Sequence, residues 1–376
     1  MSVTAPGSLL EHFADITDPR VERTKLHQLL DVLVIAMCAT ICGAEGWEDF
    51  AEFGKAKQEW FESFLELPNG IPSPDTFRRV LARLDPQEFE ACFMRWVEAV
   101  NQLASGQIVA VDGKQLRSSR DAATGLSAIH MVSAWACENR LVLGQIKVTE
   151  KSNEITAIPE LLRALALTGC IVTIDAMGCQ TEIATQIIEQ EADYVLALKG
   201  NQGTLHKDVA DYFGWAESKG FKEIAYTHHE TLEKDHGRIE QRRCWATDDV
   251  AWLEQKAKWK GLQSIIMVEA RREVIGKGTS SERRYFISSL PAQAKAALKA
   301  VRGHWGIENS LHWCLDVAMR EDASRIRRDH APENVAVLRH IALNLLKQEM
   351  SCKLGLKRKQ LKAGWDHDYL LKVLRN

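Results

Sequence analysis

The sequence has no CxxC pair and no regular cysteine spacing, although it contains nine cysteines. Zinc sites usually gather cysteine and histidine ligands at short fixed spacings, so the pattern argues against a zinc site. Cys38 and Cys42 lie in an apolar segment, and Cys170 opens an apolar run that predicts a buried strand. We therefore interpret the cysteines as small buried side chains of a protein in a reducing cytosol.

The sequence also lacks an apolar run long enough to cross a membrane. The most apolar segment, residues 32–42, is bounded by Asp31 and Gly43. It is shorter than the roughly 20 residues that a spanning helix needs, so it predicts a buried core helix. Glu11 and Asp15 interrupt the apolar stretch that a secretory signal would require. We expect a cytoplasmic protein with no membrane partner.

An excess of positive charge is missing as well. The chain has 48 Lys and Arg against 51 Asp and Glu, for a net charge of -3. Any surface that binds nucleic acid must therefore be a local basic cluster. No internal repeat or low-complexity segment is visible, and 376 residues with 45% apolar side chains suffice for two domains or one elaborated domain.

What the sequence does have is two short apolar runs that each lead into an aspartate. Residues 108–114 read IVAVDGK, where Asp112 follows a β-branched run and Gly113 is expected to end the strand. Residues 170–178 read CIVTIDAMG and place Asp175 in the equivalent position. An unpaired buried charge is costly, so each carboxylate needs a partner. Two strands could thus bring two aspartates to one sheet edge, although each could instead cap the turn that follows it.

Residues 1–102 predict an all-α domain. Helical spacing holds to about residue 65, and a proline- and glycine-rich break follows at residues 68–74. Ser73 or Asp75 is expected to cap the next helix, whose polar face carries three arginines. These arginines could bind DNA or simply be solvated: Arg78, Arg79 and Arg83.

Residues 103–376 predict an α/β domain with a mixed sheet. Strands are expected at residues 108–112, 128–136, 141–148, 170–175 and 193–198, with helices at 158–167, 182–190 and up to 213. A β-rich insertion of charged strands is predicted at about residues 216–290. Helices resume after Pro291, and the segment 353–362 is basic with no acidic residue.

One of these late helices carries Glu308, His312 and Asp316 at i, i+4 and i+8, which predicts one shared face. Two strand aspartates and a helix acid would form an oxygen-only cation site, which suits Mg²⁺ or Mn²⁺. Two such ions about 4 Å apart can clamp the attacking and leaving oxygens of a phosphodiester. Spacing alone leaves open whether Glu308 or Asp316 is the third acid. The acids of this helix could also simply pair with neighbouring arginines.

Several motifs resemble one known family. They are AVDGKQLR, KSNEITAIPELL, TIDAMGCQ, DYVLALKGNQ, HGRIEQR and HWGIENSLHWCLDVAMRED. Together, from about Leu9 to the C-terminus, the chain resembles the bacterial H-repeat-associated insertion-sequence transposases. These are DDE transposases, whose catalytic domain is ribonuclease-H-like and follows a helical associated domain.

The resemblance implies a DDE transposase that cleaves DNA at element ends and transfers the strand to target DNA. It implies an acidic triad of Asp112, Asp175 and Glu308 that holds two Mg²⁺ or Mn²⁺ ions. The partners would be double-stranded DNA, both element ends and target, and a second copy of the chain when two ends are synapsed. Such a protein would be cytoplasmic and nucleoid-associated when bound to DNA. Residues 1–102 would be the associated domain that binds DNA, and residues 103–376 the catalytic domain.

One branch of DDE enzymes carries a Tyr and an Arg before the Glu and a Lys after it, and this sequence departs from that pattern. Val301, His304 and Leu315 stand in those places, so Arg302, His304 and His312 are the candidate replacements. Asp316 is expected to be a structural acid paired with Arg320. Trp305 and Trp313 could be core residues or base-stacking platforms. The candidate DNA contacts are Lys114, Lys199, Asn201, His236, Arg238, Arg302, His304 and the three helix arginines, with a solvated role open for Lys114.

Two alternatives to a transposase remain from the sequence. A metal-dependent nuclease would cut DNA without strand transfer, and a catalytically silent DNA-binding protein descended from a transposase would do neither.

Overall fold

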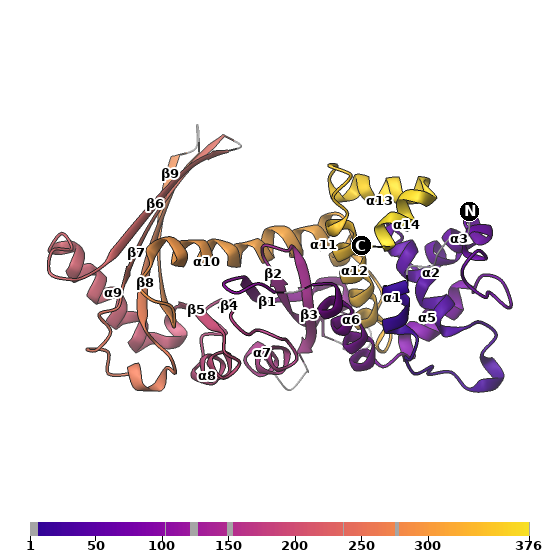
Figure 1. The fold of residues 1–376 in the computed structure, drawn as a ribbon, viewed down its shortest axis with the longest axis horizontal. Helices are drawn as coiled ribbons and strands as arrows, with labels where there is room; N and C mark the ends of the chain where they lie inside the picture. Colours follow the sequence, from indigo (N-terminus) through magenta and orange to yellow (C-terminus); the bar gives the residue numbers. More distant parts are fainter. Residues whose placement is uncertain are drawn as a thin grey trace.

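A helical region occupies one end of the molecule and a long mixed sheet extends from it to the other end (Figure 1). The computed structural model describes residues 7–101, 103–120, 127–148, 153–235, 237–274 and 278–375. Within them, the strands form one nine-stranded sheet in the order β3-β2-β1-β4-β5-β9-β8-β7-β6. The predicted α/β class with a mixed sheet is therefore confirmed.

The strands begin with β1 (Ile108–Leu116), β2 (Ile129–Ala136), β3 (Leu141–Val148), β4 (Ile171–Ile174) and β5 (Asp193–Leu198). β1, β2 and β3 pair antiparallel, whereas β4 lies parallel to both β1 and β5. The predicted bounds of β3 and β5 are those observed. The turn between β2 and β3 contains Arg140 at a φ of 55°.

β1 does not stop at Gly113, as the sequence predicted, but continues to Leu116. Gly113 pairs with Val132 inside the ladder. A Cβ at this position would lie 2.0 Å from Oε1 of Glu154 and 2.7 Å from Nε2 of His130. Glycine is therefore required here for a close side-chain approach and not for a turn. The consequence is that Asp112 lies within the strand.

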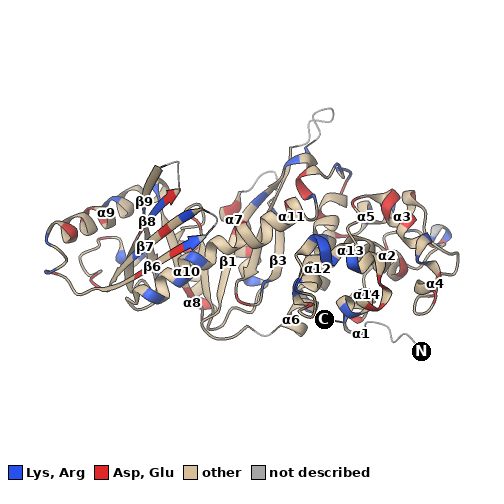
Figure 2. Cartoon of the chain, turned by 90° about the horizontal axis from the view of Figure 1, so that it is seen from above, with Lys and Arg blue, Asp and Glu red and all other residues tan. Residues whose placement is uncertain are grey.

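The predicted insertion is continuous with the main sheet. Its strands are β6 (Thr227–Asp235), β7 (Arg238–Thr247), β8 (Ser264–Val274) and β9 (Gly278–Ser288). They form an antiparallel meander, and β9 pairs with β5. The outer halves of these strands project beyond the rest of the molecule (Figure 1). Positively and negatively charged residues both lie along them (Figure 2).

Helices cover both faces of the sheet. The long helix α10 (Ala294–Gly306) crosses one face, from the β6 side towards the helical region (Figure 1). Leu298 and Val301 of α10 pack there on a core that includes Ile108 and Phe286. The opposite face is covered by α7 (Glu154–Arg163), α8 (Thr181–Glu189) and, under β9, α9 (Gly203–Ser218).

The helical region combines both ends of the chain (Figure 1). Its N-terminal helices are α1 (Gly7–Phe13), α2 (Leu29–Ile41), α3 (Trp47–Ala56), α4 (Gln58–Phe61), α5 (Pro74–Arg83) and α6 (Pro86–Val100). After α11 (Trp313–Val317), the C-terminal helices are α12 (Ala331–Gln348), α13 (Leu356–Trp365) and α14 (His367–Leu374). Buried Asn334 of α12 donates to the carbonyl oxygens of Leu81 and Leu84, so α12 is locked against the end of α5. One continuous apolar core results.

The helix α2 is the apolar segment that the sequence predicted as a core helix, and almost all of it is buried. Over the part of the chain that the structure describes, no helix combines the length and hydropathy needed to cross a membrane.

Candidate active site

Asp112 and Asp175 are neighbours because of the register between β1 and β4. Val111 pairs with Ile174, so the next residue of each chain segment is one of the two aspartates. Side chains alternate along a strand, and Ile108 and Ile171 of the same parity contact the α10 core. Both carboxylates therefore project on the α10 side of the sheet. Asp175 lies one residue past β4, and its Oδ1 accepts bonds from the backbone of Met177 and Gly178.

Glu308 reaches the same place from a π-helical turn, Ile307–His312, that follows α10 directly. It lines a pocket of about 340 Å³ together with Asp112 and Asp175. A π-turn closes with i→i+5 hydrogen bonds, and such turns occur frequently at functional sites. The structure thus brings the three predicted acids to one pocket. The π-turn breaks the simple i, i+4, i+8 face on which the sequence placed Glu308, His312 and Asp316.

The pocket gathers acidic side chains that form no direct ion pair, although Lys199 and Arg284 also line its wall. Burial raises the pKa of Asp112 to about 7, and the charges of Asp175, Glu154 and Glu308 act in the same direction. Within the described residues, no lysine or arginine forms an ion pair with Asp112, Asp175 or Glu308. A buried carboxylate among like charges is the usual signature of a functional site.

Two histidines line this region without supplying a positive charge. His312 Nδ1 lies 3.7 Å from Oδ2 of Asp112, but burial lowers the pKa of His312 to about 4. His304 Nδ1 lies 3.3 Å from the Thr173 hydroxyl, and burial lowers the pKa of His304 as well. Both rings are therefore neutral at pH 7. His304 is packed against β4 and is thereby held beside Asp175.

The donor chemistry of the pocket fits a hard divalent cation. No three His, Cys, Asp or Glu side chains of the described chain converge closely enough to hold an ion as they stand. The three pocket acids nevertheless offer only oxygen ligands, which Mg²⁺ and Mn²⁺ prefer. The raised pKa of Asp112 also means that a cation bound there would relieve an existing electrostatic cost.

Lys114 lies in a different environment from the one that a DNA contact requires. Its Nζ lies 2.5 Å from Oδ1 of Asp316 and 2.6 Å from Oε2 of Glu321, and its side chain is 11% exposed. Glu321, 2% exposed, also faces Arg339 at 3.7 Å. Asp316 thus forms a structural ion pair. The sequence predicted Arg320 as its partner, which is wrong, because Asp316 pairs with Lys114. Asp316 is not among the residues that line the pocket of the three acids.

The other predicted DNA contacts are spread over several surfaces. Lys199 lines the pocket of the three acids. Asn201 donates to the Ala176 carbonyl oxygen, so it braces the turn after Asp175. Arg238 starts β7 and pairs with Glu240 at 3.3 Å, while Arg302 pairs with Glu233 at 2.6 Å. His236 lies outside the described residues.

The three helix arginines lie on α5, at the far end of the molecule from β6–β9. Ser73 accepts a bond from the Thr76 backbone at the start of this helix, as one of the two predicted caps. Arg78 and Arg79 both pair with Asp75, and Arg83 is exposed. The basic segment 353–362 is only partly available, because Lys359 is buried and donates to the carbonyl oxygens of Leu346 and Glu349.

Sequence reasoning missed residues that line the pocket, and others that act on Asp112 from β2 and α7. Arg284 of β9 lies 4.6 Å above the Trp305 ring, and both line the pocket. His130 Nε2 lies 2.6 Å from Oε1 of Glu154, which adds to the negative potential at Asp112. The motif that contains Glu154 was visible in the sequence, whereas nothing marked Arg284. Trp313 is 59% exposed and is not a core residue.

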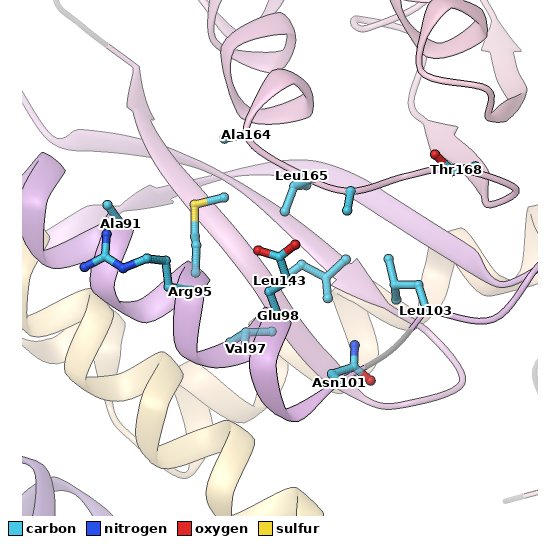
Figure 3. Close-up of a pocket in the computed structure, with 12 residues that line it drawn as sticks. Ala91, Arg95, Val97, Glu98, Asn101, Leu103, Leu143, Ala164, Leu165 and Thr168 are labelled. Atoms are coloured by element: carbon cyan, nitrogen blue, oxygen red, sulfur yellow. The ribbon is translucent and has the colours of Figure 1, made fainter. Parts of the chain in front are cut away.

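A larger hollow of about 690 Å³ lies apart from the three acids, between α6, β3 and the segment after α7. Leu103, Leu143 and Leu165 line it, with Arg95 and Glu98 among them (Figure 3). None of the predicted site residues is part of its wall. Thr168 of its wall precedes β4, whereas Asp175 follows β4, so the hollow and the candidate site lie at opposite ends of this strand.

Two family models match the chain. The model described as a transposase DDE domain matches residues 103–345, and the model described as DDE_Tnp_1-associated matches residues 10–97.

The relatives cover nearly the whole chain. "H repeat-associated putative transposase YhhI" of Escherichia coli strain K12 is 41% identical over 372 residues, 97% of this chain and 97% of the relative. YncI of Escherichia coli O157:H7 is 41% identical over 98% of this chain and 94% of its own length. An uncharacterized protein in the dhlA 3′ region of Xanthobacter autotrophicus is 48% identical over 74% of this chain and 94% of its own length.

Among solved structures, piggyBac transposase in a synaptic complex with hairpin DNA matches with a TM-score of 0.41 and 10% identity. The match covers 100% of this chain and 79% of that chain, but so low a score supports no conclusion about this chain.

Proposed function

Since this chain belongs to the family of transposases with a DDE domain, we propose that it is an active DNA transposase whose catalytic acids are Asp112, Asp175 and Glu308. It would bind the ends of an insertion sequence in the bacterial nucleoid, cleave phosphodiesters there and join the cut end to target DNA. Two copies would act when two ends are held together.

The observation that supports the proposal is the acidic pocket, in which Asp112 and Asp175 are half-buried and Glu308 is exposed. The three carboxylates line one pocket of about 340 Å³, and no described lysine or arginine forms an ion pair with them, although Lys199 and Arg284 also line it. Gathering these acids without an ion pair costs free energy, as the raised pKa of Asp112 indicates. The charge has a use if divalent cations and a phosphodiester are the ligands.

Asp112, Asp175 and Glu308 would hold the two Mg²⁺ or Mn²⁺ ions. Bound there, the ions would make a water or 3′-hydroxyl nucleophilic and stabilise charge on the leaving oxygen. The protein contributes the position of the three acids. His304, fixed against Thr173, and Arg284, fixed over Trp305, would orient the DNA at the pocket wall.

The same proposal covers the domain organisation. Three antiparallel strands followed by two parallel strands, with an aspartate at β1 and another after β4, fit a ribonuclease-H-like catalytic domain within residues 103–376. Residues 1–102 would form the associated domain, with Arg78, Arg79 and Arg83 as DNA contacts. Lys199, Arg238, Arg302 and His236 would contact DNA nearer the pocket.

The experiment is an in vitro reaction of the purified chain with duplexes that carry its element's terminal repeats, with and without Mg²⁺. Mg²⁺-dependent nicking at the repeat and joining of the 3′ end to a plasmid are the expected results. Nicking without joining would identify a nuclease. Specific binding without nicking would identify a silent DNA-binding descendant, and either result would reject an active transposase.

A further inference from the structure

An open groove of about 630 Å³ runs between β6 and the exposed side of α10. It is a different hollow from the pocket of the three acids. The two lie along the same helix, with Gly303 on the wall of the groove and His304 on the wall of the pocket. The polar residues of its wall are His229, Thr231, Gln293, Lys295, Lys299 and Arg302.

Side-chain bonds fix the groove at both ends. The Thr227 hydroxyl accepts a bond of 2.8 Å from the Ala294 backbone N–H and donates to the Ala292 carbonyl oxygen at 2.7 Å. This ties the start of β6 to the start of α10. Glu233, further along β6, pairs with Arg302 at 2.6 Å. Strand and helix therefore lie side by side (Figure 2), and the space between them is a formed site.

Among the residues that the structure describes, the wall of this groove has cations and no acid. Lys295, Lys299 and Arg302 are spaced by four and three residues, so they share one side of α10. Lys299 and Arg302 have partners outside the groove wall, Glu138 at 2.9 Å and Glu233. These are exposed pairs, worth about 1 kcal/mol or less, which a phosphate can replace. In a chain of net charge -3, such a cluster indicates a surface that binds an anionic ligand.

Two further observations point to phosphate oxygens. Lys295 forms no ion pair within the described part of the chain, so its ammonium is available. The Thr231 hydroxyl oxygen is buried in the wall and lacks a hydrogen-bond partner. A hydroxyl and ammonium groups are among the groups that commonly contact the phosphates of DNA.

The groove also lies at a suitable distance from the proposed chemistry. Arg302 and Lys295 precede Glu308 by six and thirteen residues, which is about 9 and 20 Å of helix at 1.5 Å per residue. At about 3.4 Å per nucleotide, this corresponds to roughly three to six nucleotides.

We propose that this groove binds the phosphate backbone of double-stranded DNA about three to six nucleotides from the bond to be cut. Its contacts with the phosphates are His229, Thr231, Lys295, Lys299 and Arg302. The proposal rests on the function proposed above and adds the path by which the duplex reaches the pocket. It commits to DNA because the cations form a row along the same helix that carries pocket residues His304 and Trp305.

The test compares Lys295→Gln/Lys299→Gln with Lys256→Gln/Lys258→Gln. The control lysines are exposed on the turn Lys256–Lys258, and Lys258 lies beside α8 on the opposite face of the sheet. Binding to a terminal-repeat duplex is measured without divalent ions over a series of salt concentrations. Each lost phosphate contact reduces the magnitude of the slope of log affinity against log salt by about 0.9. The slope of the groove variant should therefore be shallower than that of the parent by about 2, and the slope of the control variant should equal that of the parent.

A second measurement locates the contact. Neutral methylphosphonates placed about three to six nucleotides from the cut should weaken binding to the parent chain but not to the groove variant. If the parent binds and cuts the duplex but the groove variant has the same salt slope as the parent, the proposal that this groove binds DNA is wrong, and the proposed function stands. Equal losses in groove and control variants would also overturn it, since they would show only bulk charge. A parent that binds no terminal-repeat DNA would overturn both proposals.

Discussion

Two acidic clusters on the same strand and the same late helical segment have opposite electrostatics. Asp112 of β1 faces Glu308, and Lys114, two residues on, faces Asp316 and Glu321. Burial raises the pKa of Asp112 to about 7, with like charges adding to it. The pKa of Glu321 is lowered although burial would raise it, because Lys114 and Arg339 lie close.

The comparison teaches which acids are kept for a ligand. Burial alone does not explain the contrast, because Glu321, whose pKa is lowered, is 2% exposed, whereas Asp112, whose pKa is raised, is half-buried. The distinguishing feature is whether the fold supplies a cation. Where it does, the acids hold β1 to the segment after α10, and where it does not, a bound cation would lower the electrostatic cost. Substitutions in either cluster therefore test this contrast.

The largest expected effect is the loss of cleavage on removal of a pocket acid. Asp112→Ala, Asp175→Ala and Glu308→Gln should each lower the rate of Mg²⁺-dependent nicking by on the order of 10³-fold or more, because each removes a proposed ion ligand. Affinity for terminal-repeat DNA should change little. Nicking rates and binding curves for the three variants check this, and parental nicking by Asp112→Ala would remove the pocket from the mechanism.

The next effect lies in the neutralised cluster. Lys114→Met should destabilise the fold by about 3–5 kcal/mol, because it leaves Glu321 buried beside one remaining, more distant cation. Denaturant titration measures the loss. Lys199→Met is the matched control, since Lys199 is exposed, and it should leave the unfolding free energy within about 0.5 kcal/mol. A Lys114→Met chain as stable as its parent would show that the pairing does not hold the fold.

Asp112→Asn should have a smaller effect of opposite sign. The folded-state pKa of Asp112 is about 7 against an ordinary 3.8, so ionised Asp112 destabilises the fold. The cost grows as pH rises from about 4 to 7 and is complete above 7. Without divalent ions, the variant should melt a few degrees above its parent at pH 8, from a gain of about 1–3 kcal/mol.

Thermal melts of parent and variant at pH 8 and pH 4.5 provide the measurement. The gain should fade at the lower pH, where the parent carboxyl is protonated in the folded chain. A gain of equal size at both pH values would mean that the charge of Asp112 is not its source.

The elements were largely predictable because local patterns determine them. The two apolar runs with their aspartates and the bounds of β3 and β5 follow from periodicity and turn residues. The prediction that β1 ends at Gly113 was wrong because the role of this glycine depends on Glu154 and His130, which approach from elsewhere in the chain. A glycine that ends a strand and one that admits a side chain look alike in sequence.

The site was predictable in its acids but not in its contacts. The motifs indicated Asp112, Asp175 and Glu308, whose proximity follows from strand register. The π-turn at Ile307–His312 has no signal in a pattern based on 3.6 residues per turn. The pairing of Lys114 with Asp316 joins residues 202 apart, so the spacing along the helix favoured Arg320.

The smallest effect concerns Asp316, the acid that spacing alone could not separate from Glu308. Its side chain is 31% exposed, and Lys114 keeps the buried Glu321 as a partner if Asp316 is neutralised. Asp316→Asn should therefore cost about 1 kcal/mol or less and leave the nicking rate within a few-fold of the parent. Glu308→Gln should show the reverse, unchanged stability and no nicking. Denaturant titration and nicking assays on the same two preparations decide the matter. A Mn²⁺-soaked crystal structure gives an independent readout, since an ion on Asp316 with Glu308 turned away would exchange the roles of the two acids.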